Sequence, residues 1–133
     1  MNIWYGTGEN KHFSNLEYRP FFYKEKLYIS VEQAYQSNKS GNFDRDTYNK
    51  FTGPGQKHIG HRAKTDGDWN IDLMVDLIYE SFNQNLKYKL ALVKTGNEII
   101  THNQEKSVWK ELFPKILMDL REEFKIEIEQ CST

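Results

Sequence analysis

Apolar residues recur with the period of an α-helix in two stretches of the chain. Between Trp69 and Asn85 they stand three or four positions apart, at Ile71, Met74, Val75, Ile78 and Phe82. After Pro114 the same spacing continues through Ile116, Leu117, Leu120, Phe124 and Ile128. Side chains with this spacing lie on one face of a helix. The pattern therefore predicts one amphipathic helix over residues 69–85 and a second one after Pro114.

A different pattern precedes the first of these helices. The aromatic run at residues 21–23 is separated from the apolar run at 27–29 by charged residues at 24–26. Two short runs of strand-forming residues around a polar turn are typical of a β-hairpin. We therefore expect a hairpin over residues 19–29.

Ser30 has the side chain of a helix N-cap, and Gln33 completes a capping box, so we expect a helix that runs to about Lys39 and ends at Gly41. One face of this helix is polar and carries Glu32, Tyr35, Gln36 and Lys39. Two interpretations are open. The charges at the two ends of the helix complement its dipole, or the face supplies a carboxylate, two hydrogen-bonding groups and an ammonium to a site.

Turn and cap signals predict the remaining elements. These are strands over residues 2–5 and 98–101 and helices over 44–51, 54–64 and 86–94, the last followed by the C′ glycine Gly96. No repeat, linker or low-complexity tract interrupts them. The expected architecture is a single α+β domain over residues 1–133, rich in helix and with a small N-terminal antiparallel sheet.

Composition narrows the class of protein. The chain has 18 Lys and Arg against 19 Asp and Glu, a net charge of −1 that argues against binding nucleic acid by bulk positive charge. Cys131 is the single cysteine, which excludes an internal disulfide and a zinc site built on several cysteines. No apolar run approaches the ~18 residues of a membrane span, and the first residues lack a signal-peptide pattern. We expect a cytoplasmic protein without membrane association.

Residues 53–64 form a locally basic stretch that contains several glycines. Glycine N–H groups and the charges of Lys57, Arg62 and Lys64 can bind a phosphate, whereas a solvated surface is the alternative, since the Walker spacing is missing. His58 and His61 are three residues apart, but no cysteine or His-Glu-x-x-His pattern accompanies them. We therefore expect no metal.

Two tryptophans, Trp69 and Trp109, lie beside charged residues at predicted helix starts. A ring in such a place stacks on a nucleobase or packs in the core. Position in the sequence leaves both interpretations open.

Taken in order, several segments resemble the NADAR (NAD- and ADP-ribose-associated), or YbiA-like, family. The matching segments are Phe13-Ser14-Asn15, the hairpin over 21–29, Ser30 to Gln36 with Lys39, Gly60-His61-Arg62, Asp68-Trp69, Met74, Phe82 to Asn85, Leu90 to Gly96, Trp109 and Leu117 to Arg121. Each motif alone is modest. Their order and spacing span nearly the whole chain and are together quite specific.

The resemblance implies a YbiA-like fold and an N-glycosidase without a metal or other cofactor. Some family members cleave a ribosylamino-pyrimidine phosphate of riboflavin synthesis, and some remove ADP-ribose from modified guanine in nucleic acid. Glu32 matches the family's catalytic glutamate. The substrate-binding residues expected from motif position or residue type are Asn15, Gln36, Lys39, Gly60, His61, Arg62, Asp68, Trp69 and Trp109.

The chain departs from the family pattern at several positions. Gln33 stands where the family has histidine, and His61 stands where an arginine is expected, with Arg62 following. Around Trp109, Thr101 and Lys106 replace acidic residues, and Lys110 and Glu111 replace glycines. These departures concern ligand recognition and leave the carboxylate in place.

The chemistry expected of Glu32 follows from the bond that is broken. Cleavage of a C1′–N bond builds positive charge on the ribose, which a fixed carboxylate stabilises while it activates water. The substrate would be a phosphorylated nucleotide-like or ADP-ribosyl compound, free or within modified nucleic acid. One alternative is a catalytically weak module that binds ADP-ribose or a related nucleotide. Another is an interaction protein in which Glu32 and Lys39 point into solvent.

Overall fold

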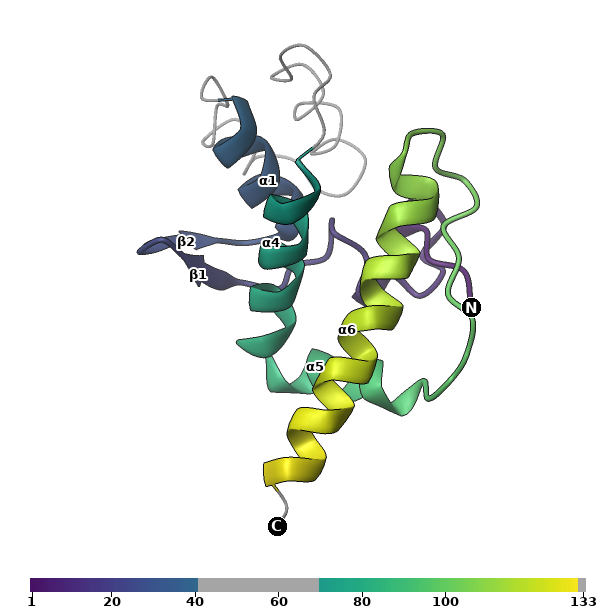
Figure 1. The fold of residues 1–133 in the computed structure, drawn as a ribbon. Coiled ribbons are helices and arrows are strands. Elements are labelled where there is room, and N and C mark those ends of the chain that lie inside the picture. The colour runs from purple at the N-terminus through teal and green to yellow at the C-terminus, as the bar shows by residue number, and fades with distance from the viewer. Residues whose placement is uncertain (41–69, 132–133) are drawn as a thin grey trace.

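The computed structural model describes residues 1–40 and 70–131. In this part of the chain, four α-helices accompany one two-stranded antiparallel sheet, so the α+β expectation is confirmed (Figure 1). The strands are β1 (Phe21–Tyr23) and β2 (Lys26–Tyr28), and the helices are α1 (Val31–Ser40), α4 (Ile71–Asn83), α5 (Leu86–Lys94) and α6 (Trp109–Cys131). Short 3₁₀ helices, η1 (Tyr5–Thr7) and η2 (Lys11–Phe13), precede the sheet. The helices predicted over 44–51 and 54–64 lie outside the described residues.

The predicted hairpin is confirmed, with a tighter turn. Phe21 pairs with Tyr28 and Tyr23 with Lys26, so Lys26 belongs to β2 and not to the turn. Lys24 and Glu25 have φ angles of 50° and 68°, the left-handed conformation of a two-residue hairpin turn. The alternation of strand side chains buries Phe21 and Tyr28.

Helix α1 begins at the predicted cap. The backbone N–H of Gln33 donates to Ser30 Oγ at 3.2 Å. The Gln33 side chain returns a bond to the hairpin, because its Oε1 accepts from the N–H of Ile29 at 2.8 Å. The Gln33 side chain therefore bonds to the backbone of Ile29, which is one residue before Ser30, the N-cap residue. This links β2 directly to the first turn of α1.

The long helices follow the predicted periodicity, with corrected starts. Asn70 and not Trp69 precedes α4, and Asn70 Oδ1 caps the helix by accepting from the N–H of Leu73 at 3.0 Å. Helix α6 starts at Trp109 and continues through Pro114. Pro114 has no N–H to donate to the carbonyl of Lys110, and because Lys110 is exposed, water can bond to that carbonyl instead.

The strands predicted over 2–5 and 98–101 are wrong. The structure has only isolated bridges there, between Asn2 and Thr101 and between Trp4 and Glu9. The chain turns back into η1 directly after Trp4, so neither segment can extend the pairing. Helix α5 and its C′ glycine, Gly96 with a φ of 65°, agree with expectation.

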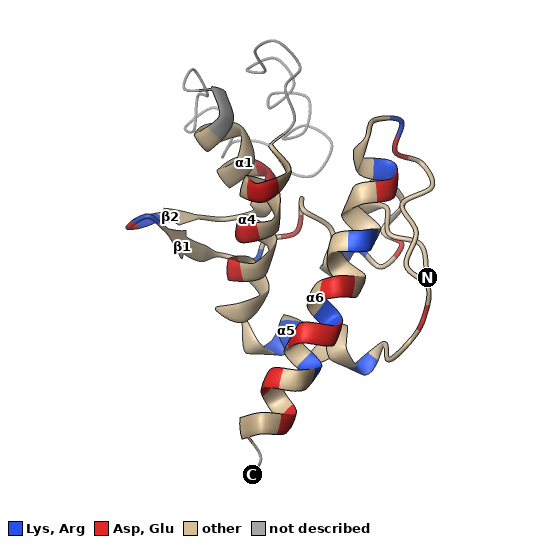
Figure 2. Ribbon diagram, in the orientation of Figure 1, with Lys and Arg blue, Asp and Glu red and all other residues tan. Residues whose placement is uncertain are grey.

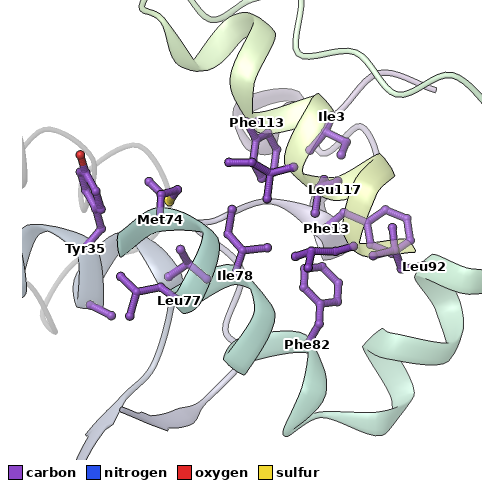
Figure 3. Close-up of a cluster of buried hydrophobic side chains, with 14 of the residues drawn as sticks. Ile3, Phe13, Tyr35, Met74, Leu77, Ile78, Phe82, Leu92, Phe113 and Leu117 are labelled. Atoms are coloured by element: carbon purple, nitrogen blue, oxygen red, sulfur yellow. The ribbon is translucent and has the colours of Figure 1, made fainter. Parts of the chain in front are cut away.

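Helices α4 and α6 build the core together with the N-terminal segment (Figure 3). The buried side chains labelled there, all no more than 2% exposed, are Ile3, Phe13, Tyr35, Met74, Leu77, Ile78, Phe82, Leu92, Phe113 and Leu117. The predicted stripe on α4 is confirmed at Met74, Ile78 and Phe82. Ile71 is 43% exposed, since it stands in the first turn, ahead of the packed part of the helix. No helix in residues 1–40 and 70–131 has both the length and the apolar character needed to cross a membrane.

Candidate functional site

Asn15 and Glu32 are neighbours in the structure. The backbone N–H of Glu32 donates to the Asn15 carbonyl oxygen at 3.0 Å. The Asn15 side-chain amide points to α4, where its Nδ2 lies 3.6 Å from the sulfur of Met74. The Asn15 Oδ1 is buried and has no hydrogen-bond partner in the described part of the chain. Two of the residues predicted from sequence are thus joined, with an unsatisfied acceptor beside the carboxylate-bearing helix.

Gln36 holds the side chain of Glu32. Its Nε2 donates to Glu32 Oε1 at 3.2 Å across one turn of α1. Gln36 is 5% exposed, and Glu32 is half-buried. Hydrogen bonds to a carboxylate are stronger than neutral ones, so the contact orients the carboxylate. The polar face of α1 is therefore packed into the protein at Gln36 and not fully solvated.

Tyr35, on the same face, joins α1 to two other helices. Its hydroxyl accepts a hydrogen bond from the backbone N–H of Asn70 at 3.0 Å. Its ring meets the ring of Trp109 edge to face, with 5.8 Å between centroids and 85° between planes. Burial raises the pKa of Tyr35, the Asn70 N–H lowers it, and the charge of Glu32 raises it. The group is therefore a neutral phenol at physiological pH.

Trp109 reaches this cluster from the start of α6. Its backbone N–H donates to Ser107 Oγ at 3.2 Å, and its side chain is 9% exposed. Trp109 does open a helix, α6, although the apolar pattern places the start of that helix after Pro114, and the ring belongs to the core edge beside Tyr35. The structure thus brings Asn15, Glu32 and Gln36 together and adds Trp109 through Tyr35.

The other predicted site residues lie outside the described part of the structure. These are the side chain of Lys39, in the last turn of α1, and the residues Gly60, His61, Arg62, Asp68 and Trp69. His58, weighed as a metal ligand, lies there too. Among residues 1–40 and 70–131 no group of three or more His, Cys, Asp or Glu side chains can hold a metal ion.

Arg19 supports the loop that carries Asn15. The guanidinium is fully buried, and its Nη1 donates to the carbonyls of His12 at 2.9 Å and Ser14 at 3.3 Å. Its Nε donates to Ser81 Oγ on α4 at 3.1 Å. The guanidinium carbon lies 4.1 Å from the centroid of the Phe82 ring. Arg19 therefore ties the loop over residues 12–15 to α4.

Sequence reasoning missed Arg19 as a contributor to the site, and it placed Tyr35 on the polar face of α1 without naming it among the substrate-binding residues. The helical spacing that placed Tyr35 beside Glu32 was a usable signal. The sequence held no such signal for Arg19, because an arginine beside an aromatic strand is ordinarily exposed. Its burial comes from contacts with residues distant in the sequence.

Comparisons with known proteins assign no family. No protein-family model matches this chain, and comparisons with curated proteins and with solved structures found no match.

Proposed function

We propose that the protein is an N-glycosidase that hydrolyses the C1′–N bond of a phosphorylated ribosyl or ADP-ribosyl compound. One observation carries the proposal: the half-buried carboxylate of Glu32 is oriented by Gln36, on a helix turn bonded to Asn15. A fixed carboxylate is the group that this reaction requires.

The reaction needs two actions from Glu32. As the C1′–N bond lengthens, positive charge develops on the ribose, and the carboxylate stabilises it. The same carboxylate takes a proton from water, whose oxygen attacks C1′. The electron pair of the broken bond leaves with the base nitrogen, which is then protonated by solvent or by an acid, for which Asp68 is the candidate.

Asn15 supplies the second argument for a ligand at this place. A buried acceptor without a partner costs about 1–3 kcal/mol, so a native structure retains one where a donor arrives. The Asn15 Oδ1 is such an acceptor. We propose that it accepts a hydrogen bond from a hydroxyl or amine of the substrate.

The resemblance to the NADAR or YbiA-like family supports the same assignment. Under this proposal the fold is YbiA-like, Lys39, Arg62 and His61 bind the phosphate, and Trp69 stacks on the base. The departure at Gln33 has a structural use, because Gln33 is fully buried and accepts the N–H of Ile29. It is therefore compatible with retained catalysis.

The distribution of charge favours a single small ligand or one modified base. Helix α4, beside α1, carries Asp72, Asp76 and Glu80 and no Lys or Arg (Figure 2). Such a face repels a continuous phosphate backbone. The proposed substrate therefore presents its phosphate locally, as ADP-ribose on a base or a ribose phosphate does.

A module that binds ADP-ribose without turnover is the alternative. It is favoured by the start of α6, where Trp109 is 9% exposed and exposed Lys110 occupies a position that is glycine in the family. Such a site would offer fewer contacts to a transition state.

Turnover assays separate the two functions. The protein is incubated with ADP-ribosylated guanine in DNA and, separately, with a ribosylamino-pyrimidine phosphate, and release of ADP-ribose or ribose 5-phosphate is followed. The N-glycosidase proposal expects release from one of them. Micromolar binding of ADP-ribose by calorimetry without any release would support the binding module instead.

A further inference from the structure

We infer that Tyr35 is a positioning residue of this site, which holds the start of α4 and the ring of Trp109 against the face of α1 that carries Glu32. The inference rests on the proposed function. It adds a residue that the sequence placed on the polar face without assigning it a role.

The first contact sets the position of α4. The Tyr35 hydroxyl accepts the N–H of Asn70 at 3.0 Å, and the side chain of Asn70 caps α4 through Leu73. One hydroxyl on α1 is therefore bonded to the residue that determines where α4 begins. In Figure 1, α1 lies beside this end of α4.

The second contact sets the position of Trp109. Its ring stands edge to face with Tyr35 at 5.8 Å, an arrangement that aromatic pairs prefer. Trp109 is also the first residue of α6, so the helix fixes its backbone while Tyr35 contacts its ring. Tyr35 thus connects α1, α4 and α6, and it lies at the α1 end of the buried cluster in Figure 3.

Tyr35 positions other groups and does not itself react. It is 1% exposed, and its hydroxyl oxygen accepts a hydrogen bond from the backbone N–H of Asn70, so we assign it a positioning and not a catalytic role. Glu32 is held independently, by the carbonyl of Asn15 and the amide of Gln36. Loss of the Tyr35 hydroxyl should therefore displace the start of α4 and the ring of Trp109 more than it displaces the carboxylate of Glu32.

The kinetic test uses Tyr35→Phe, which keeps the ring, and Tyr79→Phe as the matched control. The Tyr79 hydroxyl also makes a hydrogen bond, to Glu127 at 3.3 Å, where α4 meets the far part of α6. Removal of one hydrogen bond should raise KM about fivefold in Tyr35→Phe, with kcat changed less than about twofold. Tyr79→Phe should change neither. A fall in kcat at unchanged KM, as expected if only the folded fraction drops, would overturn the positioning role.

Amide hydrogen exchange tests the contact without any substrate. In Tyr35→Phe the N–H of Asn70 should exchange about fivefold faster, and in Tyr79→Phe at the wild-type rate. Unchanged exchange at Asn70 in Tyr35→Phe would overturn the inference at its first step. If the wild-type protein cleaves neither substrate, the proposed function fails and the role of Tyr35 fails with it, whatever Asn70 does. If the wild type is active and Tyr35→Phe keeps its KM, the inference alone fails.

Discussion

The backbone N–H of Glu32 donates a hydrogen bond to the carbonyl oxygen of Asn15 at 3.0 Å. The first N–H groups of a helix have no partner within the helix, so a loop carbonyl that accepts one of them fixes the helix start. This bond places the carboxylate-bearing turn of α1 relative to the loop over residues 12–15. That loop is in turn held by Arg19.

Replacement of Arg19 by Met should destabilise the protein. The variant keeps an unbranched stem but leaves Ser81 Oγ and the carbonyls of His12 and Ser14 without this donor. Burial of the charge already lowers the pKa of Arg19 to about 10, which shows that its desolvation offsets part of the gain. We expect the free energy of unfolding to fall by about 2 kcal/mol.

Urea unfolding measures this change. Lys115→Met is the control, because the ion pair of Lys115 with Asp119 is exposed and contributes little. Equal stability of Arg19→Met and Lys115→Met would show that the loop does not depend on the guanidinium.

Gln33→Ala should destabilise the protein by about 1 kcal/mol, because the partly buried N–H of Ile29 loses its acceptor. Gln33→Glu keeps a side-chain acceptor at a fully buried position, so it should retain more of the stability at acidic pH, where the carboxyl is neutral. Thermal unfolding of both variants checks the order. If Gln33→Ala is as stable as the wild type, the hydrogen bond between Ile29 and Gln33 does not contribute to the stability of the protein.

Gln36→Leu should lower kcat about tenfold, since the Glu32 carboxylate loses the amide that orients it. Gln84→Leu is the matched control. The Gln84 amide bonds to both backbone groups of Phe22, away from α1, so its loss should cost stability without changing kcat in the folded protein. Active-site titration with steady-state kinetics separates the two effects. Equal kcat values for Gln36→Leu and wild type would contradict an orienting role for Gln36.

Stability should fall at alkaline pH through two half-buried tyrosines, Tyr79 and Tyr88. Burial raises the pKa of Tyr79 and Tyr88, and the nearby carboxylates of Glu127 and Glu17 raise it further. The native state then holds the phenol proton more tightly than the unfolded state does. This stabilisation is complete below the unfolded pKa of ~10 and is lost as pH rises through the folded pKa.

Urea unfolding between pH ~9 and ~11 tests this dependence. The double variant Tyr79→Phe/Tyr88→Phe should show a smaller loss of stability over that interval than the wild type. Identical slopes for the two proteins would mean that these tyrosines do not contribute.

The predictable parts of the fold are those determined by neighbours in the sequence. The apolar period located α4, Ser30 located α1, and Gly96 located the end of α5. The prediction that α6 begins after Pro114 is wrong, because a proline often opens a helix but is also tolerated in an early turn. The expected strands over 2–5 and 98–101 failed because only one bridge joins Asn2 and Thr101.

The candidate site was predictable to the same degree. Helical spacing placed Gln36 beside Glu32, and this contact is confirmed. The bond between Asn15 and Glu32 spans the hairpin, and no local pattern specifies it. The roles of Tyr35 and Arg19 depend on Asn70, Trp109 and Ser81, which reach them only through the tertiary fold. The activity itself stays a proposal.

The central claim is tested most directly by single-turnover hydrolysis with Glu32→Gln. Glu122→Gln is the matched control, because Glu122 is an exposed helix carboxylate on α6 with no part in the proposed site. On whichever of the two proposed substrates the wild type cleaves, Glu32→Gln should be slower by at least about a hundredfold, and Glu122→Gln should be close to wild type. Release of ADP-ribose or ribose 5-phosphate by Glu32→Gln at the wild-type rate would contradict the account.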